Sequence, residues 1–188
     1  MATLAPALAR ALEHEGVYSN DPDDVGAETY CGIARHFWPS WEGWPAIDAC
    51  RRYADFPDCI DRPAFAAKMR PAVADFYALN FWQPIRGDLI THQGIADEVF
   101  EQAVNMGVGT ASTNLQLALN ALNRHAKDWP DVPVDGRIGN GTLAACTAAV
   151  AKGRAGVVAK ALNVLQGAKY LSSRNEKFVN GWLSRVEI

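Results

Sequence analysis

A glutamate near the start of the chain is notable for its place on a predicted helix. Leu4, Leu8 and Leu12 recur at helical spacing and form an apolar stripe. On a helical wheel Glu15 falls in the middle of this stripe, whereas Glu13 projects to the opposite side. A carboxylate on the buried face of a helix is either paired structurally or has its proton affinity raised by desolvation. The second environment suits a general acid at neutral pH, so Glu15 is a candidate catalytic acid.

An acidic segment follows this helix. Asp21, Asp23, Asp24 and Glu28 lie in a stretch rich in Asp, Pro and Gly, which is typical of a loop. A second carboxylate from this loop could face Glu15 across a cleft, and two facing carboxylates are the arrangement that cleaves glycosidic bonds. Each acid is equally explained as a solvated loop residue or a helix cap. We interpret Glu28 as the less favoured second acid and as an exposed partner for the loop.

Aromatic residues offer a possible sugar-binding surface. Tyrosine and tryptophan have flat apolar faces with one polar group, which suits stacking on a saccharide ring. Core packing is the alternative for each, because most of the six tryptophans must be buried somewhere in a chain of 188 residues. Tyr30 is close to the acidic segment, so we favour a place in the cleft for it. The other candidates are Trp38, Trp41, Trp44 and Trp82.

The cysteines and histidines do not suggest a metal site. Cys31, Cys50, Cys59 and Cys146 form no C-x-x-C pair, and no histidine lies at the spacing of a zinc ligand. We interpret the cysteines as structural thiols, with a Cys50–Cys59 disulfide as the alternative. The four histidines share no spacing with each other or with a nucleophile and are read as surface or structural residues. We therefore expect no metal and no cofactor.

The elements that must position these residues are mainly helices. Apolar positions recur at helical spacing in most of the chain, with one possible small hairpin near residues 18–34 and a short strand from Tyr30 to Ile33. Pro63 is placed to open a helix, and a turn is predicted at 134–139. The predicted helices cover residues 4–15, 46–54, 63–77, 95–106, 115–126, 142–150 and 158–168. The sequence thus predicts a mainly α fold.

The composition excludes several classes of partner. Apolar residues make up 49% of the chain, charged residues 21%, and the net charge is −3, which is typical of a globular protein. The basic residues are scattered, which argues against nucleic acid. The longest weakly polar stretch, residues 141–150, is too short to span a bilayer. The first ten residues lack the features of a cleavable secretory signal, so we expect synthesis in the cytoplasm. We also expect a monomer.

Several short motifs in the same order give a resemblance to a known family. Residues 15–33 resemble the opening motif of glycoside hydrolase family 108, the N-acetylmuramidases, whose usual form is E-G-G-Y, then D-P-x-D-x-G-G-x-T, then G-I. Further along, the chain resembles the family at Phe81–Ile85, Gln102–Gly107 and Leu115–Gln116. Residues 134–143 and 181–186 are similar to the peptidoglycan-binding-like region that ends these chains. The resemblance covers nearly the whole chain and implies a lysozyme-like helical fold.

The resemblance also implies roles for individual residues. The catalytic glutamate of the family falls on Glu15, in agreement with the helical wheel, and its second acidic position falls on Asp24. The spacing from Glu15 through Asp24 to Thr29 is similar to that of phage-type lysozymes, which gives Thr29 a catalytic role. Val17 and Ala27 stand where the family has glycine, so the loop that holds Asp24 can be reshaped.

The activity implied is hydrolysis of the β-1,4 bond between N-acetylmuramic acid and N-acetylglucosamine in peptidoglycan. Glu15 would donate a proton to the leaving glycosidic oxygen. Asp24, ionised, would either stabilise the positive charge or, with Thr29, hold the attacking water. The first arrangement retains and the second inverts the anomeric configuration, and the sequence leaves both open. Tyr30, Trp82 and Asn105 are the predicted substrate-binding residues. The Asp135–Gly136 pair is interpreted as a turn.

The resemblance predicts two regions packed into one compact unit. Residues 1–94 would be the muramidase region and residues 95–188 the helical peptidoglycan-binding-like region. Two other functions stay open: a lytic transglycosylase, which also uses one buried glutamate, and a non-catalytic module that binds the cell wall. The route to the wall is open as well, either as a phage endolysin or as a protein associated with secretion. In both cases we expect action at the cell wall or in the periplasm.

Overall fold

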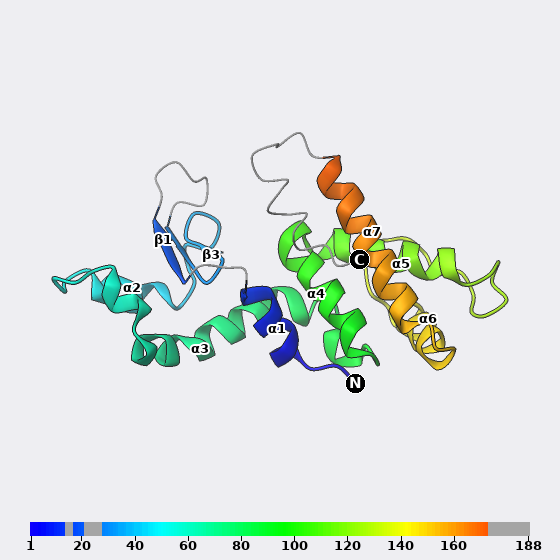
Figure 1. The fold of residues 1–188 in the computed structure, drawn as a ribbon, viewed down its shortest axis with the longest axis horizontal. Coiled ribbons are helices and arrows are strands. Elements are labelled where there is room, and N and C mark those ends of the chain that lie inside the picture. The colour runs from blue at the N-terminus through cyan, green and yellow to red at the C-terminus, as the bar shows by residue number, and fades with distance from the viewer. Residues whose placement is uncertain (14–16, 21–27, 173–188) are drawn as a thin grey trace. The chain divides into compact units, whose positions relative to one another are not determined.

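The computed structural model describes residues 1–13, 17–20 and 28–172 (Figure 1). Within these residues the fold is mainly helical with a small antiparallel sheet, which confirms the predicted fold class. The helices are α1 (Leu4–Leu12), α2 (Trp44–Cys50), α3 (Pro63–Tyr77), α4 (Gln93–Met106), α5 (Val108–Leu122), α6 (Asn140–Ala151) and α7 (Ala155–Leu171). The strands are β1 (Tyr18–Asn20), β2 (Glu28–Tyr30) and β3 (Ile33–Ala34), and the short helical turns are η1 (Asp58–Asp61), η2 (Ala78–Trp82) and η3 (Gly87–Leu89).

The sheet confirms the hairpin predicted near residues 18–34 and corrects one detail. Strand β2 is central and pairs antiparallel with β1, where Ser19 is opposite Thr29, and with β3, where Thr29 is opposite Ala34. The strand predicted from Tyr30 to Ile33 is wrong. Cys31 (φ 46°) and Gly32 (φ 75°) have left-handed backbone, so this segment is the tight turn that joins β2 to β3.

Helix α3 follows its predicted pattern closely. Pro63 occupies the first helical turn. Backbone N–H groups in this turn have no partner within the helix, so the absence of an N–H on proline costs no hydrogen bond. The buried side chains of the helix are Met69, Val73, Phe76 and Tyr77, which recur at helical spacing, and its bounds are those predicted. Burial of this stripe, rather than intrinsic helix propensity, accounts for the stability of such a helix.

The chain divides into two compact units. Residues 8–80 form one, which we call the hairpin unit, and residues 1–7 together with 81–188 form the other, the helical unit. This division comes at residue 80, whereas the sequence predicted functional regions that meet at residue 94. Whether catalysis and wall binding separate at residue 94, and whether the two regions pack as one, stay predictions.

The helical unit is built around α4, α5 and α7, each of which packs on the other two (Figure 1). Gly107 lies between the end of α4 and the start of α5. Its φ of 88° is a backbone conformation that L side chains rarely adopt. The buried Gln102 on α4 donates to the Leu162 carbonyl of α7 (2.9 Å) and accepts from Asn114 of α5 (2.8 Å). These bonds satisfy polar groups in the core and fix the three helices together.

The first residues of the chain are tied to the same unit. The Ala2 N–H donates to the Ile90 carbonyl (2.9 Å), and Gln93 exchanges two hydrogen bonds with the backbone of Thr3 (2.9 and 3.0 Å).

Among the described residues, no helix combines the length and the apolar character needed to cross a bilayer.

Candidate functional site

Two of the three predicted catalytic residues, Glu15 and Asp24, lie outside the described residues. The third, Thr29, is at the centre of β2 and is half-buried. Its neighbours Glu28 and Tyr30 are buried, and because side chains alternate along a strand, Thr29 faces the other side of the sheet. No residue in the described part of the chain forms a hydrogen bond with the Thr29 hydroxyl. That hydroxyl is therefore available to hold a water or a substrate oxygen.

Glu28 corrects the sequence interpretation, which made it an exposed partner for the loop. Its side chain is only 7% exposed, and its carboxylate accepts hydrogen bonds from Arg51 and Tyr18 and forms an ion pair with Arg35. Arg35 Nε lies 2.6 Å from Oε2, Arg51 Nη2 lies 2.5 Å from Oε1, and the Tyr18 hydroxyl donates to Oε1 (2.9 Å). A carboxylate held by two guanidinium groups and a hydroxyl is fixed in place, so Glu28 anchors β2.

The same arginines connect the sheet to α2. Arg35 donates to both carboxylate oxygens of Asp48 (3.1 and 2.7 Å), and Arg51 donates to Asp48 Oδ1 (3.3 Å). The Arg35 guanidinium also lies 4.3 Å from the centre of the Trp44 ring, within the range of a cation–π contact. We call Glu28, Arg35, Asp48 and Arg51 the ion-pair cluster. It joins β2, the end of β3 and α2 in one rigid network.

The ion-pair cluster changes the acidity of its members. The hydrogen bond from Arg35 holds the pKa of Asp48 below its usual range, and Arg51 acts in the same direction. Burial, and next the hydrogen bond to Glu28, raise the pKa of Tyr18 to about 12. Tyr18 therefore remains a neutral hydrogen-bond donor at physiological pH, which is the form that its contact with Glu28 requires.

Most of the candidate aromatic residues lie in the core. Tyr30 is 1% exposed, stacks on Trp41 (ring centroids 6.0 Å apart) and meets Phe65 edge to face. Trp41 and Trp44 are also buried and contact each other at a right angle. For these three residues the structure supports the packing alternative, and a contact between Tyr30 and a sugar stays a prediction.

Trp82 is buried in the helical unit, at 2% exposure. Its Nε1 donates to Asp88 Oδ1 (2.8 Å), and its ring meets Phe100 at 5.7 Å. Gly87 lies so close to the indole ring that a Cβ there would approach it to 2.3 Å. The ring is thus enclosed by packing, and the predicted role of Trp82 in substrate binding stays a prediction.

Asn105 lies in the last turn of α4 and is half-buried. It precedes Gly107, whose positive φ ends the helix, as the sequence predicted for this position. Hydrogen bonding between Asn105 and the substrate stays a prediction.

The turn predicted at Asp135–Gly136 is confirmed, and it is held by the side chain of one glutamine. Gln116, 1% exposed on α5, accepts from the N–H groups of Asp135 (3.1 Å) and Gly136 (3.0 Å). Its amide nitrogen donates to Asp135 Oδ1 (2.8 Å) and to the Arg137 carbonyl (2.9 Å). Gly136 has φ 71°, a left-handed conformation that glycine adopts without strain. The motif at Leu115–Gln116 and the motif at residues 134–143 are therefore held together by hydrogen bonds of one side chain.

The described residues also bear on the metal and disulfide predictions. Within the described part of the chain, no group of three or more His, Cys, Asp or Glu side chains is placed to hold a metal ion. Cys31 is half-buried, the other three cysteines are buried, and none of the four forms a disulfide with a described residue. The Cys59 thiol donates to the Cys50 carbonyl (3.9 Å), so these two residues are adjacent without being bonded.

Comparison with known families assigns the chain to a class of enzymes. Residues 8–107 match the family model of glycosyl hydrolase 108, and residues 110–187 match one described as a predicted peptidoglycan domain. The first match spans more than half of the chain, so the protein belongs to the glycosyl hydrolase 108 family. Together the matches make it a glycoside hydrolase of the peptidoglycan-hydrolase type.

A solved structure gives the same picture at the level of the fold. The structure of Brucella abortus SagA is similar to this chain with a TM-score of 0.67 and 26% sequence identity. The similarity covers 98% of this chain and 89% of the SagA chain. No curated protein sequence matches the chain.

Proposed function

We propose that the protein is an N-acetylmuramidase that hydrolyses the β-1,4 bond between N-acetylmuramic acid and N-acetylglucosamine. The observation that carries this proposal is the family match over residues 8–107, which includes Glu15, Asp24 and Thr29. The match of residues 110–187 to a predicted peptidoglycan domain supports the same substrate. The site of action proposed is the bacterial cell wall or the periplasm, in phage lysis or in secretion.

In the proposed mechanism Glu15 is the general acid, and it protonates the glycosidic oxygen as the positive charge develops on the sugar ring. Asp24 either stabilises that charge or orients the attacking water together with Thr29. The available hydroxyl of Thr29 supports the second role. Glu28 acts as a positioning residue because its two arginines fix β2, the strand that carries Thr29.

The remaining predicted substrate residues have different support. Burial of Tyr30 and Trp82 favours for each a role in packing within its own unit, because neither ring exposes a face. Asn105 is half-buried and is our proposed hydrogen-bond partner for the substrate. We propose peptidoglycan glycan strands as the binding partner and a monomer as the working form.

The test is mass spectrometry of soluble fragments from purified peptidoglycan digested by the wild type and by Glu15→Gln. We expect fragments with reducing N-acetylmuramic acid ends from the wild type and none from the variant. The matched control is Glu13→Gln, which removes a carboxylate two residues away and is expected to keep full activity. Anhydro ends would identify a lytic transglycosylase instead, and a wild type that yields no fragments would favour a wall-binding module.

A further inference from the structure

The hairpin unit contains a groove that the proposed catalytic mechanism does not use. It has a volume of about 470 Å³ and lies between the segment after β3 and the last turns of α3 with η2. Its lining combines aromatic and aliphatic surface with polar side chains, and it includes no lysine, arginine or histidine. The residues that carry the argument are Trp38, Glu42, Asp75, Phe76, Leu79 and Asn80.

Trp38 is the one tryptophan of the hairpin unit that presents part of its ring to solvent, with 38% exposure against 7% for Trp41 and 2% for Trp44. Its ring is held at right angles to Phe76, with centroids 4.9 Å apart. Its carbonyl accepts from Trp44 Nε1 (2.7 Å). The hydrogen bond fixes the backbone of Trp38 and the contact with Phe76 restricts its ring, which lowers the entropy cost of binding a ligand.

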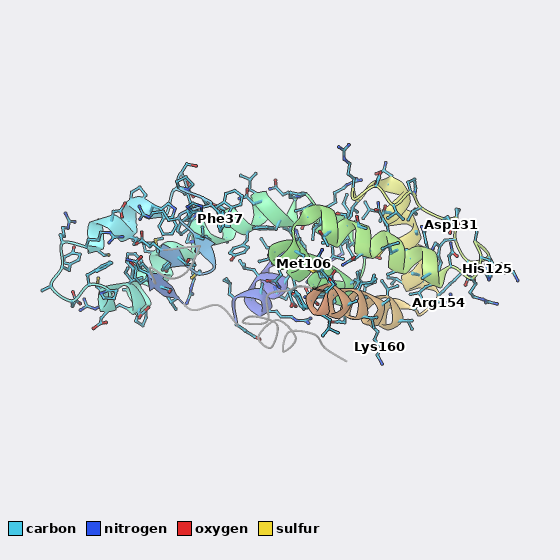
Figure 2. All side chains as sticks on the ribbon, turned by 90° about the horizontal axis from the view of Figure 1, so that it is seen from above. Phe37, Met106, His125, Asp131, Arg154 and Lys160 are labelled. Atoms are coloured by element: carbon cyan, nitrogen blue, oxygen red, sulfur yellow. The ribbon has the colours of Figure 1, made fainter. Side chains whose placement is uncertain are left out.

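Exposed apolar surface continues beside this ring. Leu79, which also lines the groove, is 64% exposed. Phe37, the residue before Trp38, is labelled in Figure 2 and is 62% exposed, but it does not line the groove. Apolar side chains gathered on one surface and edged by polar groups mark a binding site more often than a chance cluster.

The polar groups of the groove are free to bind. Glu42 and Asp75 are exposed, and neither carboxylate forms a hydrogen bond or an ion pair with a residue in the described part of the chain. Asn80 donates one amide hydrogen to the Phe76 carbonyl (2.8 Å), which leaves its own oxygen as an acceptor. The groove thus offers several acceptors around one fixed aromatic ring.

We propose that this groove binds a neutral saccharide segment, with Trp38 stacked against the C–H face of a sugar ring and Glu42 and Asp75 accepting hydrogen bonds from its hydroxyls. An anionic ligand is disfavoured because two carboxylates and no cation line the groove. An apolar peptide is disfavoured because it would bury those carboxylates without partners. The proposal rests on the proposed function only in naming the glycan backbone of peptidoglycan as the natural ligand.

The test uses the full chain with the Glu15→Gln substitution, labelled with 5-fluorotryptophan, and an N-acetylglucosamine tetramer as the probe. The fluorine signal of Trp38 is assigned from Trp38→Phe. We expect the tetramer to shift this signal while the signal of the buried Trp44 stays in place. Asp75→Asn, a change at an exposed position, is expected to weaken the titrated affinity by about tenfold, the loss of one or two hydrogen bonds to a charged group.

The matched control is Tyr53→Ala, which removes an aromatic ring of 52% exposure from outside the groove and is expected to leave the affinity unchanged. A Trp38 signal that does not move at saturating tetramer would overturn the proposal. So would a shift of this signal on simple concentration of the protein without the tetramer, which would indicate that a second copy of the chain occupies the groove. None of these results depends on hydrolysis. The test of sugar binding in the groove is therefore independent of the test of muramidase activity.

Discussion

At the scale of single residues, the neighbours Glu28 and Thr29 on β2 have different environments and different proposed roles. Glu28 is buried and bound by two arginines, whereas Thr29 faces the other side of the sheet with a hydroxyl that no described residue engages. The sequence placed both in or beside an acidic loop and could not distinguish their environments. A strand of three residues is too short for an alternating pattern to be recognised in the sequence. The only indication that Glu28 is buried was that it lies two residues from Tyr30, on the same side of the strand.

Thr29 provides the first prediction at this scale. If its hydroxyl orients the attacking water, Thr29→Val keeps the shape of the side chain and lowers kcat by about 10- to 100-fold with little change in KM. Thr29→Ser retains the hydroxyl and is expected to recover most of the rate. The measurement is the release of reducing ends from soluble peptidoglycan fragments. Equal rates for the wild type and Thr29→Val would exclude this role.

Asp48 gives a prediction on pH. Its pKa is lowered in the folded state, so its contribution to stability is complete above the ordinary value of 3.8 and is lost as the pH falls through the lower folded value. Asp48→Asn is therefore expected to lower stability at neutral pH and to flatten its decline in acid below about pH 4. Urea unfolding from pH 7 to pH 2 measures both effects.

The control for this pH series is Asp58→Asn, at an exposed aspartate of η1 that forms no ion pair with a described residue. Its pH profile is expected to follow the wild type. An Asp48→Asn profile parallel to that of the wild type would show that the ion-pair cluster contributes nothing to acid stability.

At the scale of elements, the turn after α5 depends on the glutamine beneath it. Gln116→Leu is expected to lower the free energy of unfolding by about 2–4 kcal/mol, because two backbone N–H groups and a carboxylate lose their buried partner. Thermal denaturation and hydrogen exchange at Asp135 and Gly136 measure the effect. Thr147→Ala is the control, since that exposed hydroxyl bonds only to the Leu143 carbonyl of its own helix, and it is expected to change stability by less than about 0.5 kcal/mol.

The elements that sequence reasoning predicted well are those with long patterns. Helix α3 has fifteen residues and four buried positions at helical spacing, so its stripe was readable, and Pro63 marked its start. The short strands β2 and β3 were not readable, and the turn of Cys31 and Gly32 was taken for strand. The tryptophans were equally ambiguous, because a core ring such as Trp41 and a partly exposed ring such as Trp38 carry the same local sequence signal.

At the scale of the whole molecule, the charge balance makes a prediction about the substrate. The net charge of −3 gives no strong attraction to an anionic cell wall, unlike that of a basic lysozyme. Clearing of purified walls is therefore expected to change by less than about twofold between low and moderate salt. The assay is turbidity loss of purified walls over a salt series, with a basic lysozyme as the comparison. A steep loss of activity with salt would show that local positive charge, rather than net charge, guides binding.

The division into two units has a further consequence for the integrity of the chain. The hairpin unit is an insertion, because the helical unit contains both residues 1–7 and residues 81–188. Ala2 and Thr3 are hydrogen-bonded to Ile90 and Gln93, so the polypeptide enters and leaves the hairpin unit from one and the same unit. A single proteolytic nick within residues 8–80 would leave both fragments attached to the helical unit. A cleaved enzyme can thus remain one particle in solution.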